Sequence, residues 1–138
     1  MPLGTSITVD RPHAIVGDEV RAALRQQGFG VITEIDVQAT LREKLGEQTD
    51  PYLILGACDP AFAHRALTAD PSIGLLLPCN VVVRAHEGRT VVEVVDPILL
   101  IGAVGPGGHP SLSEVADEAS RRLNAALDAV ANGPVPTP

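Results

Sequence analysis

The stretch Val81-Val82-Val83-Arg84-Ala85-His86-Glu87-Gly88-Arg89-Thr90-Val91-Val92-Glu93-Val94-Val95 bears most directly on the fold of this chain. Two valine-rich runs flank a short segment that contains glycine, a pattern typical of two antiparallel strands joined by a turn. It predicts a β-hairpin with arms over residues 75–84 and 89–96. Asp96-Pro97 ends the second arm, because proline cannot continue a hydrogen-bonded strand.

Helices and strands are expected to alternate on both sides of this hairpin. Apolar spacing and capping signals predict strands over 5–9, 29–35 and 52–55, and helices over 13–27, 37–45, 59–69 and 112–131. The resulting order is β-α-β-α-β-α-β-β-α. The early alternation suits a parallel α/β sheet, whereas the hairpin and the closing helix argue for an α+β fold. The pattern leaves both fold classes open.

Length and composition predict one domain with an aliphatic core. The chain has 138 residues, of which 45% are hydrophobic, but it contains no Trp, one Tyr and two Phe. Such a core suits a sheet covered by helices, where branched aliphatic side chains pack on the pleated face. We expect the domain to span residues 1–132. Residues 133–138 contain three prolines and are expected to form a disordered tail.

The charge and the apolar runs exclude several classes of partner. The chain carries 10 basic and 17 acidic residues, for a net charge of −7, so nucleic acid and an anionic membrane surface are not expected partners. No apolar run approaches the roughly 20 residues of a membrane-spanning helix. The first residues lack the pattern of a secretory signal, and two cysteines do not make a disulfide scaffold. We therefore expect a cytoplasmic protein.

Three segments resemble one known family. They are Gly28–Asp36 (GFGVITEID), Leu55–Pro60 (LGACDP) and Gly74–Val81 (GLLLPCNV), and Asp96-Pro97 after a valine-rich strand also fits. In this order and spacing the chain resembles the domain of unknown function 302 family over roughly residues 13 to 130. The resemblance implies a TATA-binding-protein-like α+β fold, with an antiparallel sheet of about five strands and long helices packed on it. It implies no activity and no cofactor, and the glycine-rich loop at 102–109 departs from the family pattern.

Cys58 and Cys79 are the first candidate site residues. Cys58 precedes the expected helix start at Asp59-Pro60, where the helix dipole favours a thiolate and the carboxylate of Asp59 opposes it. If their strands are antiparallel neighbours, both thiols lie at the same edge of the sheet. A thiol pair can form a redox couple or bind a soft metal. The alternative is that both cysteines are small buried hydrophobes.

Four further residues are weaker candidates. Glu34 is expected on the strand face opposite Phe29, Val31, Thr33 and Ile35, as an acid, base or ligand. The alternative is that it faces solvent or pairs with an arginine such as Arg84 or Arg89. The remaining three are Asn80 as a ligand contact, Asp96 as a ligand contact or turn residue, and His64 as a third metal ligand beside the cysteines.

These observations favour a small binding domain that holds a small molecule or a soft metal in a cleft between the sheet and its helices. Two alternatives remain: a cysteine-dependent thiol or redox enzyme, and an interaction module without a pocket. We also expect a homodimer that pairs exposed strand edges at 81–83 and 91–95.

Overall fold

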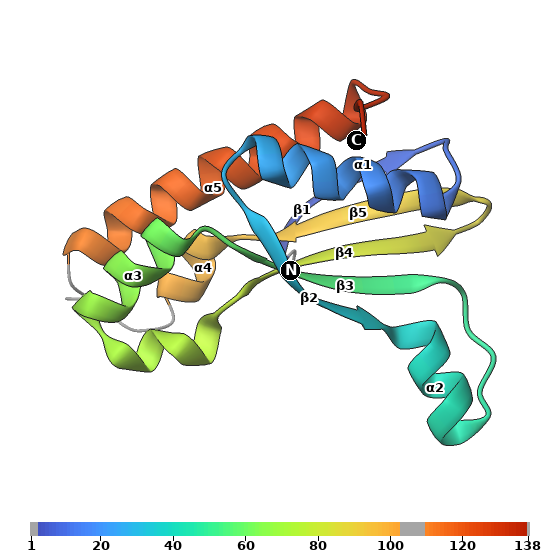
Figure 1. Cartoon of the computed structure of the whole chain (residues 1–138), viewed down its shortest axis with the longest axis horizontal. Coiled ribbons are helices and arrows are strands. Elements are labelled where there is room, and N and C mark those ends of the chain that lie inside the picture. Colours follow the sequence, from blue (N-terminus) through green and yellow to red (C-terminus); the bar gives the residue numbers. More distant parts are fainter. Residues whose placement is uncertain (1–2, 103–109, 138) are drawn as a thin grey trace.

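The computed structural model describes residues 3–102 and 110–137 (Figure 1). Its strands are β1 (Gly4–Val9), β2 (Gly30–Asp36), β3 (Tyr52–Cys58), β4 (Cys79–His86) and β5 (Arg89–Val95). Its helices are α1 (His13–Gln26), α2 (Val37–Leu45), α3 (Pro60–Ala69), the 3-10 helix η1 (Pro71–Leu76), α4 (Pro97–Gly102) and α5 (Pro110–Ala131). The predicted order of strands and long helices is confirmed, and η1 and α4 are additions to it.

The strands form one antiparallel sheet in the order β1-β5-β4-β3-β2, which confirms the α+β class and excludes the parallel alternative. The hairpin strands β4 and β5 therefore lie inside the sheet, and most of their valines are buried: Val81, Val83, Val91, Val92 and Val94. The prediction that 81–83 and 91–95 offer free strand edges is wrong, because β3 and β1 pair with them on either side. The edges belong to β1 and β2.

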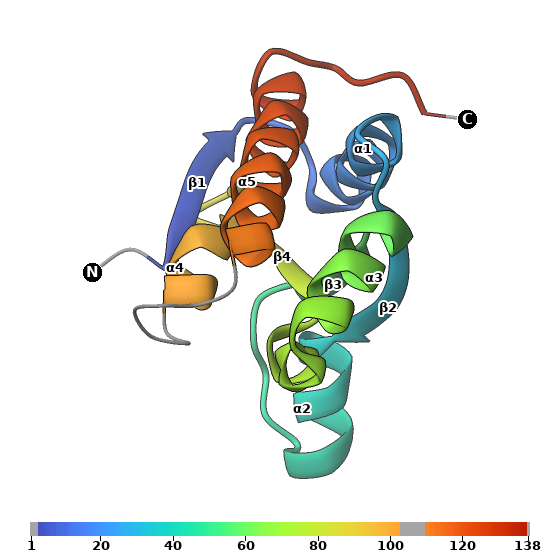
Figure 2. The same ribbon diagram turned by 90° about the vertical axis from the view of Figure 1, so that its left-hand side faces the viewer.

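One face of the sheet carries the helical layer. α1 and α5 lie side by side across the strands, and the first half of α5 extends beyond them to pack against α3 and α4 (Figures 1 and 2). The helix-facing positions of the strands are apolar: Leu53, Val83 and Val92 form one row, and Leu55, Val81 and Val94 form the next. We call the opposite side, on which neither α1 nor α5 packs, the open face.

The boundaries differ from prediction near the candidate cysteines. β3 continues past Leu55 to Cys58, and β4 begins at Cys79 rather than at residue 75. Residues 71–76 form η1 instead, because the side chain of Asp70 accepts the Ser72 N–H at 2.9 Å and Pro71 occupies the first helical position. The glycine-rich loop was predicted at 102–109, and residues 103–109 lie outside the described residues.

The segment after α5 contacts the body of the domain. Val135 is buried in the main hydrophobic cluster, and its N–H donates to Oε2 of Glu19 on α1 at 2.7 Å. Glu19 is 2% exposed, and Arg11 donates to both of its carboxylate oxygens. Nη2 of Arg11 also donates to the carbonyl oxygen of Val130 at 2.6 Å. We call this set of contacts the Glu19 clasp; it holds the tail against the body, because a buried carboxylate needs such partners.

Within the two described stretches, no helix is both long enough and apolar enough to cross a membrane.

Candidate functional site

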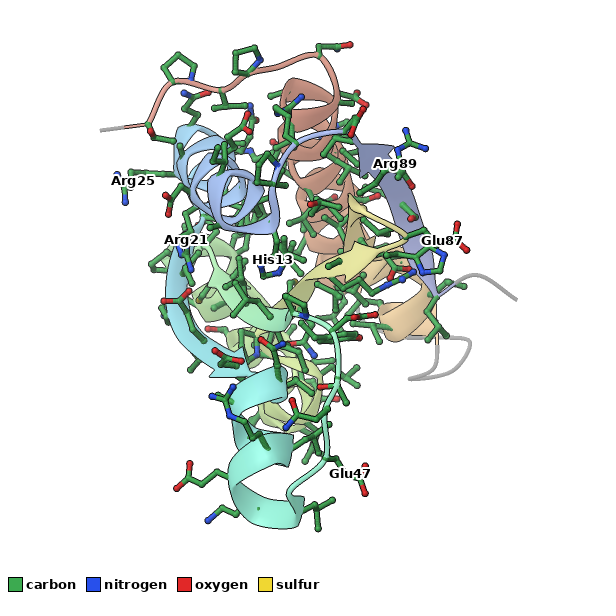
Figure 3. The ribbon with its side chains drawn as sticks, turned by 90° about the vertical axis from the view of Figure 1, so that its right-hand side faces the viewer. His13, Arg21, Arg25, Glu47, Glu87 and Arg89 are labelled. Atoms are coloured by element: carbon green, nitrogen blue, oxygen red, sulfur yellow. The ribbon has the colours of Figure 1, made fainter. Side chains whose placement is uncertain are left out.

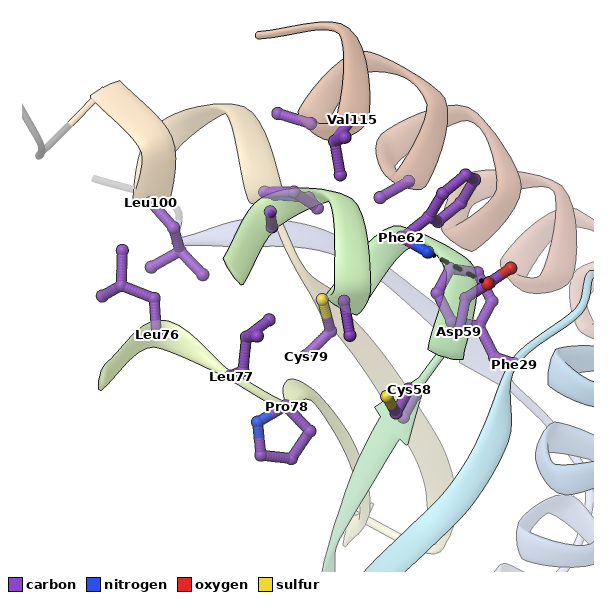
Figure 4. Close-up of a pocket in the computed structure, with 16 residues that line it drawn as sticks. Phe29, Cys58, Asp59, Phe62, Leu76, Leu77, Pro78, Cys79, Leu100 and Val115 are labelled. Atoms are coloured by element: carbon purple, nitrogen blue, oxygen red, sulfur yellow. Dashed lines mark hydrogen bonds between the residues drawn. The ribbon is translucent and has the colours of Figure 1, made fainter. Parts of the chain in front are cut away.

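A pocket lies where two hydrophobic clusters meet. The larger cluster lies between the sheet, α1 and α5, and the smaller one is formed by Ala66, Ile73, Leu112 and Val115. Between them a cavity of about 60 Å³ stays open, bounded by the ends of β3 and β4 and by α3, η1, α4 and α5 (Figure 4). We call it the seam pocket.

Small side chains keep the seam pocket open. Its lining includes five alanines, which are Ala57, Ala63, Ala66, Ala116 and Ala119. A second void lies between α1, the sheet and the later part of α5; it measures only about 10 Å³, and one alanine, Ala126, lines it among branched aliphatic side chains. Both places are apolar, so the difference in space comes from side-chain size rather than polarity.

The backbone brings the two cysteines to this pocket. β3 ends at Cys58 and β4 begins at Cys79, and the register pairs Ala57 with Cys79 across the two strands. Figure 4 shows both cysteines in the wall of the pocket. The expectation that both thiols lie at the same edge of the sheet is confirmed in the sense that β3 ends and β4 begins there, since these two strands are antiparallel neighbours.

Both thiols are held in the protonated form at neutral pH. Burial, reinforced by the charge of Asp59, raises the pKa of Cys58 above its ordinary value. Burial raises the pKa of Cys79 to about 11, and the neighbouring Cys58 adds to that shift. The pKa of Cys58 is therefore shifted in the direction expected from Asp59, and not in the direction expected from the helix dipole. Because the thiolate is the reactive and metal-binding form, neither cysteine is activated here.

A polar corner closes the pocket beside Cys58. Asp59 caps α3, accepting the N–H groups of Ala61 and Phe62 at 2.9 and 3.3 Å. Its other oxygen lies 3.6 Å from Nη1 of Arg122, whose guanidinium group lies 5.0 Å from the centre of the Phe62 ring. Gly28 faces this corner with a φ of 88°, and a Cβ there would lie 3.1 Å from both charged groups. Glycine suits this position, because any side chain would be strained by the positive φ and would crowd both charged groups.

The two phenylalanines were missed as site residues. Phe29 and Phe62 pack edge to face, with ring centres 6.3 Å apart, and both line the seam pocket. The available signal was compositional: in a chain with only two Phe, each follows a marked helix boundary, at Gly28 and at Asp59-Pro60. That signal shows where the aromatic side chains start, but not that they converge.

Glu34 lies away from the pocket. A bulge between Val31 and Thr33 shifts the alternation of β2, so that Glu34 pairs in register with the helix-facing Leu55. Val31 therefore shares its face, and only Thr33 and Ile35 lie on the opposite one, unlike the predicted arrangement. There the carboxylate forms an ion pair with Arg21 of α1, not with Arg84 or Arg89.

The other candidates also lie outside the pocket lining. Asn80 is exposed on β4, on the open face, where its register partner is Gly56. Asp96 accepts the Ile98 N–H at 2.9 Å and so starts α4, which agrees with the reading as a turn residue. His64 is an exposed residue of α3. Among the described residues, no three His, Cys, Asp or Glu side chains are grouped to hold a metal.

A wider groove of about 410 Å³ lies between α1, the start of α2 and the start of β3. Several of its polar side chains have partners: Nε2 of His13 lies 2.9 Å from the Val83 carbonyl oxygen, and Arg21 pairs with Asp18 and Glu34. Figure 3 shows His13 and Arg21 on this side of the molecule, above the projecting α2. The groove is larger than the seam pocket, but it is an ion-paired surface.

The comparisons with known proteins agree on one family. The sequence profile of the family described as "Domain of unknown function DUF302" matches residues 5–130. The crystal structure of an uncharacterized conserved DUF302 protein from Bacillus stearothermophilus is 30% identical, with a TM-score of 0.84, and the match covers 93% of this chain and 98% of that one. None of the curated proteins matches the chain.

Proposed function

The chain belongs to the domain of unknown function 302 family, and from the geometry of its own site we propose that it binds a small apolar ligand in the seam pocket. The observation that carries this proposal is the hollow between two otherwise packed clusters. Protein interiors seldom leave such space unfilled. An apolar cavity with one polar corner is the usual form of a small-molecule site, because the apolar wall supplies affinity and the corner fixes orientation.

The state of the thiols supports binding over thiol chemistry. A nucleophilic or redox cysteine needs a lowered pKa, and both cysteines here have raised ones. Metal binding at this pair would require both protons to leave against the same effects. Protonated thiols behave as small apolar groups, and they suit a wall that contacts hydrocarbon. Two free cysteines also fit our proposal of a reducing, cytoplasmic location.

The corner formed by Asp59 and Arg122 defines the ligand further. Arg122 is 40% exposed, and it donates from Nε to Glu118 and from Nη1 to the carbonyl oxygen of Gln27, which leaves the N–H groups of Nη2 for solvent or a ligand. A hydrocarbon chain in the pocket can therefore end in a hydroxyl or carbonyl oxygen that accepts a hydrogen bond from Arg122. We propose a short aliphatic alcohol, aldehyde or ester as the ligand class.

A titration with straight-chain alcohols from butanol to octanol, followed by amide NMR shifts, tests this proposal. Affinity is expected to rise by about 0.8 kcal/mol, or roughly fourfold, for each methylene buried, and to level off once the pocket is full. The shifts should centre on Phe29, Phe62 and Cys79.

Ala116→Met tests the location, because a flexible thioether at this position of α5 fills the cavity. It should weaken octanol binding by at least about tenfold. Ala131→Met, at an exposed position of the same helix, should leave the affinity unchanged. Equal binding by both variants would contradict the proposal. So would a purified protein that carries a chelator-removable metal lost in Cys79→Ser, since the pocket would then be a soft-metal site.

A further inference from the structure

The open face of the sheet carries an apolar row. Because side chains alternate along a strand, the register assigns to it Ile35, Ile54 and Val82 as one row across three neighbouring strands. Ile35 is 50% exposed, and Ile32 at the bulge beside it is 61% exposed. The described helices that cross the sheet, α1 and α5, lie on its other side (Figures 1 and 2). This row, with Ile32 beside it, is therefore an apolar strip that neither α1 nor α5 covers.

The open face carries few charges. In a chain of net charge −7, the alternation of the strands places three charged residues on this face, Arg84, Arg89 and Glu93. Arg84 and Glu93 pair with each other, Nε to Oε1, at 2.8 Å, and Arg89 lies at the end of β5 beside the hairpin turn. Two acidic proteins repel wherever their acidic surfaces meet. The centre of the open face is thus a surface on which a second copy meets little like charge.

α2 projects from the body beside the open face and is poorly supported by its own chain (Figures 1 and 3). It has nine residues, none of them is buried, and Leu45 near its end is 69% exposed. The side chain of Asp36 and the left-handed Gly46 cap its two ends. Capping alone is insufficient, since isolated helices shorter than about 12–15 residues are marginal in water. An ordered α2 therefore calls for packing from outside its own chain.

We propose that the open face and α2 together form the interface through which two copies of this chain pair. A two-fold axis near Ile54 and Val82 places the same patch on both protomers, as an isologous dimer requires. In this arrangement the apolar rows of the two sheets face each other, and each α2 packs against the other protomer. The patch has an apolar centre and a polar border that includes Thr33 and Asn80, which is the usual anatomy of an interface.

This interface differs from the strand-edge pairing that the sequence suggested. It uses faces instead of edges, because the valine-rich strands have no free edge. It is also independent of the seam pocket, which lies on the helical side of the sheet.

Two isoleucines provide a matched test. Ile35 on the open face is 50% exposed, and Ile15 on α1 is 51% exposed, so lysine costs the fold about the same at either position. The masses of the wild type, Ile35→Lys and Ile15→Lys are measured by light scattering over a concentration series. We expect a dimer for the wild type and for Ile15→Lys. For Ile35→Lys we expect a dimer dissociation constant at least about tenfold higher, because a charge is then buried without a partner.

Amide hydrogen exchange of the wild type provides a second readout that needs no variant. The amides of α2 should exchange more slowly as the protein concentration rises through the dimer dissociation constant. If Ile35→Lys fails to fold, the concentration dependence of α2 exchange in the wild type alone decides whether the proposal holds. A monomeric wild type, or a dimer in which Ile35→Lys has no effect and α2 exchange is independent of concentration, overturns the proposal. In a monomer the open face would be left for a different protein.

Discussion

The layer between helices and sheet differs at the two ends of α5. Where α5 meets α1, branched aliphatic side chains leave about 10 Å³ unfilled, and the Glu19 clasp secures the tail beside them. Where α5 meets α3 and α4, alanines and thiols leave about 60 Å³. Both ends are lined mainly by apolar side chains, so hydrophobicity alone does not distinguish a structural core from a binding site. The difference lies in side-chain volume, and the following substitutions test it.

The largest expected effect comes from removing a branched side chain at the packed end. Leu127→Ala should lower the free energy of unfolding by about 3–4 kcal/mol, because the surroundings cannot collapse into the new cavity. Leu100→Ala, which enlarges a pocket that is already open, should cost only about 1 kcal/mol. Urea unfolding monitored by circular dichroism measures both. Equal losses would mean that the two ends are packed alike.

The Glu19 clasp should contribute the next largest effect. Glu19→Ala leaves the Val135 N–H and the guanidinium group of Arg11 without their acceptor, which should cost about 2–3 kcal/mol. Exchange of the Val135 amide should accelerate at the same time. Glu34→Gln is the matched control, since its ion pair with Arg21 is exposed and should contribute less than about 1 kcal/mol. Slow exchange at Val135 in Glu19→Ala would show that apolar packing alone holds the tail.

A single substitution at two positions of α5 compares the ends directly. Ala126→Met should destabilise the fold by about 2 kcal/mol, because no space is available for the longer side chain. Ala116→Met should change stability by less than about 1 kcal/mol, because the seam pocket accommodates it. Thermal unfolding of the two variants under one buffer condition gives the comparison. The reverse order would place the hollow at the wrong end of the helix.

The smallest effect concerns reactivity rather than stability. A thiol with a raised pKa has little thiolate at neutral pH, so iodoacetamide should modify both cysteines more slowly than it modifies a free thiol. For Cys79 the rate should keep rising with pH up to about 11, the value set by its burial. Mass spectrometry of peptides resolves the two sites. Rapid modification of the folded protein near pH 7 would instead favour the thiol enzyme.

The sequence predicted most of the fold because its signals are local. Asp36 and Asp59-Pro60 mark helix starts, and the valine runs mark strands, wherever the chain later places them. Other features depend on tertiary contacts. The N–H of Val135, in the proline-rich segment, donates to Glu19, which lies far away in the sequence. Val31 shares the face of Glu34, contrary to simple alternation, because of a bulge in β2 that periodicity does not predict.

Only part of the candidate site could be predicted from the sequence, for the same reason. Antiparallel pairing brings Cys58 and Cys79 to one edge, and that follows from strand order alone. The hollow itself depends on alanines from three separate elements facing one another, and alanine carries no positional signal. The positions of Asn80, Asp96 and His64 outside the pocket depend in the same way on how the chain folds around them.

The sheet order also governs how the chain can fold. β2, β3, β4 and β5 lie beside their neighbours in sequence, so each can pair as soon as the next is available. β1 has a single partner, β5, and the register joins Thr5 to Val94 across most of the chain. Closing so long a loop is slow, because the chain loses conformational entropy before the pairing of β1 with β5 can stabilise it. On a ribosome, the strand made first must therefore remain unpaired until β5 has emerged.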